Sequence, residues 1–132
     1  MIGLDTNVLV RYIVQDDPEQ SQAATQLIEG RCTTQSQGYV SVPVLLELVW
    51  VLTGHYNYSR PVVVSVVRQV LRTAEFTVED HDLINFAIYQ YEAGNADFAD
   101  YVIARRNYAH GCETTYTFDR KAGQEENFEL VS

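Results

Sequence analysis

The chain has 132 residues, of which 46% are hydrophobic, and its formal net charge is −9. This length and composition indicate one globular domain spanning residues 1–132 and exclude a disordered chain. The acidic balance by itself argues against nucleic-acid binding, which usually uses a basic face. No apolar run is long enough to span a membrane and no signal peptide is recognisable, so we expect a cytoplasmic location. The cysteines Cys32 and Cys112 have no spacing typical of a metal site or a disulfide framework.

The first part of the chain predicts two strands, each followed by helical sequence. Asp17 before Pro18 is typical of a helix start, with Asp17 as the N-cap and Gln20 at the capping-box position. This pattern gives Asp16 and Asp17 a structural role in preference to a ligand role. The predicted elements are a strand at 2–5, helices at 6–14 and 18–30, a strand at 39–42 and a helix at 43–54.

The valine-rich stretch "RPVVVSVVRQVLRTA" is ambiguous, because valine favours strands. Its polar residues are spaced three or four apart, which leaves one apolar stripe of helical period and predicts a helix. Asp80 and Asp97 are expected to cap the two helices that follow. The remaining predicted elements are strands at 75–78, 113–118 and 128–131. Strands that alternate with helices predict a parallel sheet covered on both faces.

Five acidic residues lie at strand ends, at a helix start or inside apolar sequence. Asp5 and Asp119 each end a predicted strand, and sites in parallel sheets gather at the carboxyl ends of strands. Glu47 lies inside the apolar sequence "VPVLLELVWVL", and Asp97 and Asp100 share one helix face. Four of the five also have a structural interpretation: Asp5 and Asp97 as helix caps, Glu47 at a wet helix edge, and Asp119 in a turn.

Carboxylates that converge repel one another unless a cation joins them, and Mg²⁺ or Mn²⁺ prefers oxygen ligands. Zinc is not expected, because the histidines His55, His81 and His110 are scattered along the chain. A carboxylate-held Mg²⁺ favours phosphodiester hydrolysis, since it activates water and neutralises charge on a phosphate. Such an ion also lets a polyanion approach an acidic pocket. Candidates for holding phosphates, or for simply balancing the acidic surface, are Arg105, Arg106, Arg120 and Lys121.

The segments "LDTN", "DFADYVIA" and "TYTFDRKA", with Glu47 in an apolar helix between the first two, resemble the motifs of PIN-domain ribonucleases. The match is closest to the VapC type, the toxins of toxin–antitoxin pairs, and it runs from Asp5 to Asp119. The resemblance implies a three-layer α/β/α fold with a parallel sheet of four or five strands. It also implies an endoribonuclease that depends on Mg²⁺ or Mn²⁺, cleaves with a metal-activated water, and leaves a 5′ phosphate and a 3′ hydroxyl.

The resemblance further implies which acids form the site. The four acids of the family map to Asp5, Glu47, Asp100 and Asp119, which are the expected catalytic and metal-binding residues. Asp5, Asp100 and Asp119 are expected to hold the metal, and Glu47 to bind a metal-linked water or a second ion. Asp97 is an accessory acid or a cap. Because Asp97 and Asp100 are both acidic, either one remains open as the third ligand.

Supporting residues and partners are implied by the same resemblance. Thr6 and Asn7 are expected to orient Asp5 or a metal-bound water, and Thr117 to support Asp119. Members of the family are usually homodimers that bind a small antitoxin similar to VapB. The apolar helices with Trp50 and the valine run are candidates for such contacts, although core packing accounts for most of their apolar surface.

Other classes fit the sequence less well. A haloacid-dehalogenase-like phosphatase requires a second aspartate two residues after Asp5, where this chain has Asn7. An aspartic protease half requires glycine at the same position and an all-β fold. A receiver-like module requires acids early in the chain and a phosphorylated aspartate after its third strand, which "EFTVED" matches only weakly. A catalytically inactive PIN-like or receiver-like binding module remains the alternative function.

Overall fold

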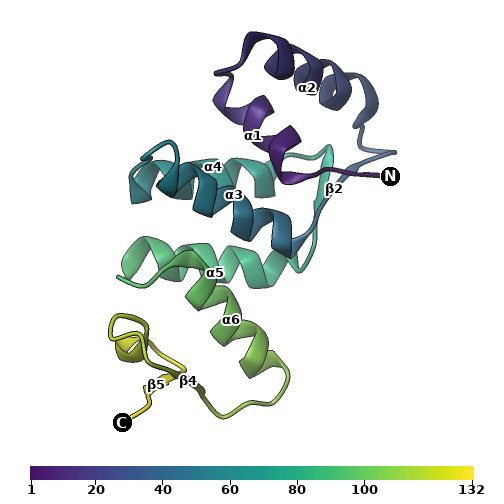
Figure 1. Ribbon diagram of the computed structural model, residues 1–132. Helices are drawn as coiled ribbons and strands as arrows, with labels where there is room; N and C mark the ends of the chain where they lie inside the picture. The colour runs from purple at the N-terminus through teal and green to yellow at the C-terminus, as the bar shows by residue number, and fades with distance from the viewer. The chain divides into compact units, whose positions relative to one another are not determined.

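The computed structural model describes the whole chain, Met1 to Ser132, and confirms the α/β class, with helices between short parallel strands (Figure 1). The chain divides into two compact units, Met1–His81 and Asp82–Ser132, which we call unit 1 and unit 2. One domain over residues 1–132 stays a prediction. No helix has both the length and the apolar character needed to cross a membrane.

Unit 1 contains a three-stranded parallel sheet whose strands follow chain order. Tyr39 in the middle strand pairs with Gly3 on one side and with Thr77 on the other. The first strand is shorter than predicted and ends before Asp5, so Asp5 lies in the turn that leads into a helix. The elements are β1 (Ile2–Gly3), α1 (Thr6–Val14), α2 (Pro18–Arg31), β2 (Gly38–Val40), α3 (Val42–Gly54), α4 (Arg60–Arg72) and β3 (Phe76–Val78).

The predicted start of α2 is confirmed, except for one half of the capping box. The Asp17 carboxylate accepts the backbone N–H of Gln20 at 2.9 Å, which satisfies a donor that the helix itself cannot. The Gln20 side chain does not return to the cap, because its Oε1 accepts the Nε–H of Arg11 at 2.8 Å. Arg11 also forms an ion pair with Asp16 at 2.9 Å. The start of α2 is therefore fastened to α1, which lies beside it (Figure 1).

The valine-rich stretch forms α4, as predicted from its polar spacing. Val63 and Val67 are fully buried on this helix, and α4 packs beside α3 (Figure 1). On α3 the leucines at 45, 48 and 52 are equally buried. Most of the apolar surface of these two helices is therefore core. Trp50 is the exception on α3, with 75% of its surface exposed.

Unit 2 contains two helices and a separate pair of parallel strands. Thr115 in one strand pairs with Phe128 in the other. Ile84, Ile88 and Tyr101 are buried in its core. The five strands are thus present but divided, three in the sheet of unit 1 and two in unit 2. The elements are α5 (His81–Ala93, whose first residue belongs to unit 1), α6 (Phe98–Ala109), β4 (Thr115–Thr117), the 3₁₀ turn η1 (Ala122–Gln124) and β5 (Phe128–Leu130).

Candidate active site

In unit 1, Thr6 links the two acids that the sequence singled out. Asp5 is the N-cap of α1, and its Oδ1 accepts the backbone N–H of Thr6 at 2.8 Å. The Thr6 hydroxyl donates to Oε1 of Glu47 on α3 at 3.2 Å. Thr6 is buried, with 6% of its surface exposed, whereas both carboxylates are exposed. The two acids are accessible to a ligand, while the residue that connects them is fixed by packing.

The structural interpretations of these two acids are also correct. Asp5 caps a helix, and Glu47 lies on the solvent side of α3 between the buried Leu45 and Leu48. A carboxylate between two apolar segments is tolerated at position 5 because it stays in water and is not transferred to the core. Capping engages only one oxygen of Asp5, so this role does not occupy the whole carboxylate.

In unit 2, Asp97 and Asp100 are bonded to each other at the start of α6. Asp97 is the N-cap, as predicted, and its backbone N–H donates to Oδ2 of Asp100 at 3.1 Å. Partial burial raises the pKa of the Asp100 carboxyl, and the hydrogen bond from Asp97 opposes that rise. The negative charges of Asp97 and Asp119 raise it further. Carboxylates from two separate parts of the sequence, the start of α6 and the turn at Asp119, therefore act on Asp100.

The loop that leads into α6 is held by side chains on three successive backbone N–H groups. The Asn95 N–H donates to Glu125 at 3.1 Å, the Ala96 N–H to the Tyr101 hydroxyl at 3.2 Å, and the Asp97 N–H to Asp100. Gly94 leaves the room for this arrangement, because a Cβ there would collide with the Tyr101 hydroxyl. These bonds, together with the capping box that Asp97 and Asp100 form, fix the position of Asp97 at the start of α6.

Asp119 lies in a tight turn between β4 and η1. Its Oδ1 accepts the backbone N–H groups of Lys121 at 2.8 Å and Ala122 at 3.0 Å. Its own N–H donates to the hydroxyl of Thr117 at 3.0 Å, which is the contact expected of the supporting residue. The predicted turn role of Asp119 is therefore correct. The same bonds fix the direction of its carboxylate.

A pocket of about 390 Å³ lies between these two parts of unit 2. Four of its five lining residues carry charge. Some of the lining residues lie at the start of α6, and the others lie in the turn after β4. The lining residues are Ala96, Asp97, Asp119, Arg120 and Lys121. Asp100 does not line the pocket, although it bonds to Asp97, which does. The structure thus brings together three of the predicted acids and two of the predicted cations.

The predicted acids are distributed over both units, with Asp5 and Glu47 in unit 1 and the other three in unit 2. Neither unit gathers three or more histidine, cysteine, aspartate or glutamate side chains closely enough to hold a metal ion by itself. The donors present are carboxylates and hydroxyls, which suit Mg²⁺ or Mn²⁺ and not zinc. The chemistry of the donor set therefore fits the metal that the sequence suggested.

Two contacts could not be found from sequence patterns. The bond between Thr6 and Glu47 joins residues 41 positions apart, and no local spacing announces it. Arg105, a candidate phosphate ligand, lies over the ring of Phe86 at 4.3 Å from its centre. This cation–π contact explains Arg105 without any phosphate.

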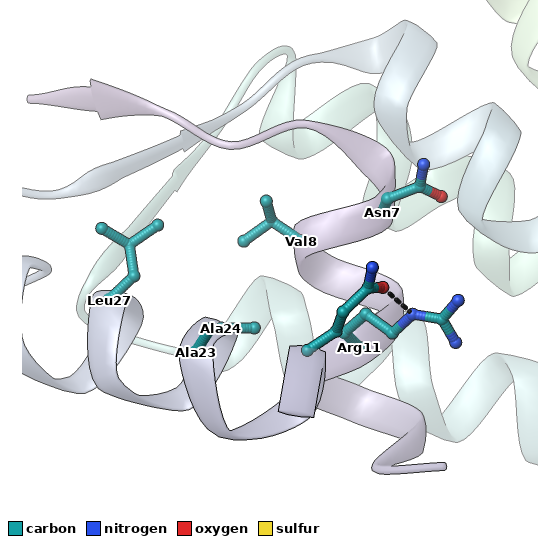
Figure 2. A pocket seen from close by; sticks show the side chains of 7 residues that line it. Asn7, Val8, Arg11, Ala23, Ala24 and Leu27 are labelled. Carbon is teal, nitrogen blue, oxygen red and sulfur yellow. Dashed lines mark hydrogen bonds between the residues drawn. The ribbon is translucent and has the colours of Figure 1, made fainter. Parts of the chain in front are cut away.

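Asn7 is expected to orient Asp5 or a metal-bound water, and this role stays a prediction. Asn7 makes no hydrogen bond to Asp5 and lies at the rim of a pocket of about 320 Å³ between α1 and α2. Figure 2 shows Val8 and Leu27 in this pocket, and the dashed line marks the bond from Arg11 to Gln20. Of Thr6 and Asn7, only Thr6 forms a hydrogen bond to the carboxylate of Asp5.

Comparisons with known proteins identify the family of this chain. A VapC ribonuclease from Aquifex aeolicus (strain VF5) is 26% identical over 118 residues, which cover 89% of this chain and 87% of that protein. The family model of the PIN domain matches residues 2–125, a range that includes all five acids. The resemblance read from the sequence motifs is therefore confirmed, and the chain belongs to the PIN domain family.

Proposed function

We propose that this protein is an endoribonuclease that depends on Mg²⁺ or Mn²⁺ and acts as the toxin of a toxin–antitoxin pair. Membership of the PIN domain family and the similarity to a protein named VapC ribonuclease support the proposal. The observation that carries it is the charged pocket of unit 2, with Asp97 and Asp119 in its wall and Asp100 bonded to Asp97. A partly buried carboxylate whose pKa is raised by burial and by two neighbouring negative charges is typical of a functional site.

As the family resemblance implies, the proposal assigns Asp5, Asp100 and Asp119 as ligands of the ion. It assigns Glu47 to a metal-linked water or a second ion, and Asp97 as an accessory acid. When bound, the ion would activate a water molecule and neutralise charge on the phosphate. The water attacks phosphorus, the bond to the 3′ oxygen breaks, and the products carry a 5′ phosphate and a 3′ hydroxyl. The residues of the chain supply orientation: the bonds to Asp119 fix that carboxylate.

Metal-dependent cleavage of RNA tests the proposal directly. We expect the purified protein to cut a pool of cellular RNA with Mn²⁺ or Mg²⁺ and to stop in EDTA. The new ends should be substrates for an exonuclease that requires a 5′ phosphate. Saturating Mn²⁺ should also stabilise the fold, by about 2.7 kcal/mol at one hundred times its dissociation constant. Asp119→Asn serves as the matched control, because Asn keeps the acceptor for the turn and loses the charge.

The alternative function predicts a different result. A catalytically inactive binding module should show neither cleavage nor stabilisation by Mn²⁺. Cleavage that persists in EDTA, or products with a 2′,3′-cyclic phosphate, would also contradict the proposal. Cleavage by Asp119→Asn at the rate of the unaltered protein would remove Asp119 from the site.

A small antitoxin similar to VapB and a second copy of the chain are the proposed partners, as the resemblance implies. The exposed Trp50 lies beside a hollow of about 440 Å³ that is also lined by Val51, Gly54 and His55. An exposed tryptophan next to a hollow is a feature of protein interfaces. Light scattering of the purified protein, alone and with the product of an adjacent small gene, tests both partners.

A further inference from the structure

Arg120 and Lys121 follow Asp119 directly and line the same pocket of unit 2. Both side chains are exposed, and neither makes an ion pair within its unit. The turn that carries them is well fixed, because Asp119 accepts the N–H of Lys121 and of the residue after it. Two unpaired positive charges are thus held at a defined place beside two carboxylates.

Most other cations of the chain are already engaged. Arg11 binds Asp16 and Gln20, Arg72 contacts Gln69, and Arg105 lies over an aromatic ring. Three more have further interactions: Arg60, Arg68 and Arg106. Of the nine cations in the sequence, these six leave three, namely Arg31, Arg120 and Lys121. Two of the three uncommitted cations therefore lie next to each other on the wall of one pocket.

This placement has a consequence for an acidic protein that acts on RNA. With a net charge of −9, most of the surface repels a polyphosphate chain, so binding requires a local positive site. Arginine can grip a phosphate through two parallel hydrogen bonds, and lysine attracts it as a compact charge. The pocket is large enough for a nucleotide-sized group.

We propose that Arg120 and Lys121 form a phosphate subsite that holds an RNA phosphate adjacent to the one that is cleaved. The inference rests on the proposed ribonuclease function and names the part of the pocket that positions the substrate. Both are positioning residues, because they bind a phosphate that does not react. If they only balanced the neighbouring carboxylates, RNA binding would not depend on them.

Salt-dependent RNA binding measures the subsite without cleavage. The probe is a fluorescent single-stranded RNA of random sequence, about 16 nucleotides long, titrated in EDTA at several salt concentrations. Each lost phosphate contact reduces the slope of log K against log salt by about 0.7 for single strands. We expect that reduction for Arg120→Gln and for Lys121→Gln, and about twice as much for the double variant. Arg120→Lys and Lys121→Arg should keep the slope of the unaltered protein.

The matched control is Arg31→Gln, which removes the same charge from an exposed cation that does not line the pocket. Its slope should equal that of the unaltered protein. Equal slopes for Arg120→Gln, Lys121→Gln and Arg31→Gln would overturn the subsite. An unaltered protein that binds no RNA even at low salt would overturn it as well. Normal subsite results with no cleavage in Mn²⁺ would instead reject the proposed ribonuclease and keep the binding site.

Lys121 is the only lysine of the chain, which allows a second measurement. An amine-acetylating reagent can modify only Lys121 and the N-terminal amine, and mass spectrometry separates the two. Saturating RNA should slow acetylation of Lys121 several-fold. Acetylation of Lys121 at the same rate with and without RNA would show that RNA does not contact this wall of the pocket.

Discussion

The two units hold their acids in different ways. In unit 1, Asp5 and Glu47 are exposed and are connected through the buried Thr6, which donates to both. In unit 2, partial burial raises the pKa of Asp100, and the charges of Asp97 and Asp119 raise it further. The first arrangement positions two carboxylates at little electrostatic cost. The second keeps carboxylates together against their repulsion, which is the arrangement that a bound cation would relieve.

The acids of the two units therefore depend on different physical effects. In unit 1 the two acids are positioned by hydrogen bonds from Thr6, so loss of its hydroxyl should reduce activity, although less than loss of a charge. In unit 2, partial burial and the neighbouring negative charges both disfavour ionised Asp100, so removal of its charge should increase stability while it harms activity. A trade between stability and activity is common where functional groups are held in unfavourable surroundings.

The largest expected effect is the loss of cleavage when a carboxylate is neutralised in either unit. Asp5→Asn and Asp100→Asn should each lower the cleavage rate by about 100-fold or more, because even residues that only support a metal ligand are worth 10- to 100-fold. Circular dichroism should show an unchanged fold in both. If Asp97→Asn is the more damaging change and Asp100→Asn is nearly silent, Asp97 is the third ligand.

A smaller effect is expected from the residue that connects the acids of unit 1. Thr6→Val removes the hydroxyl that donates to Glu47 and should reduce cleavage roughly 10-fold. Thr6→Ser keeps the hydroxyl and should restore most of the rate. Equal rates for the two variants would mean that the bond to Glu47 does not support activity. Steady-state cleavage of one defined RNA is the measurement.

The smallest expected effect is a difference in unfolding temperature between variants of the two units. The folded protein raises the pKa of Asp100, so the ionised carboxylate destabilises the fold. The contribution of the protonated carboxyl to stability is fully present only below the ordinary pKa of aspartate. That contribution is lost as the pH rises through the raised pKa. Asp100→Asn should therefore raise the unfolding temperature modestly at neutral pH. The gain should disappear at about pH 3, where the carboxyl is protonated in both states.

Asp5→Asn is the comparison for this measurement, because its carboxylate is exposed and acts as a helix cap. Asparagine is also a good cap, so Asp5→Asn should leave the unfolding temperature nearly unchanged. Stabilisation of the same size in both variants would mean that the two units do not differ as described.

Local sequence signals predicted the elements well, because caps and periodicity are local physics. Asp17 and Asp97 start helices where expected, and the polar spacing in the valine run outweighed the strand preference of valine. The signals failed where a distant partner decides the outcome. The Gln20 side chain bonds to Arg11 and does not complete the capping box, and β1 ends before Asp5.

The candidate site was predictable in composition but not in geometry. Motif order predicted the acids and their supports, and one of these supports, Thr117, does bond to Asp119. Glu125 helps to fix the loop that leads to the pocket, because its side chain accepts the backbone N–H of Asn95, thirty positions earlier. A glutamate near the end of the chain has no pattern that distinguishes it from a solvated charge. Such long-range contacts require the structure.

Trp50 is the only tryptophan of the chain, and its indole faces the solvent. A single indole gives the protein one fluorescence signal, whose emission wavelength reports the polarity around one known position. Any molecule that covers that side of α3 should shift the emission to shorter wavelengths, whereas events confined to other surfaces leave the colour unchanged. Partner binding can thus be followed optically, without a label.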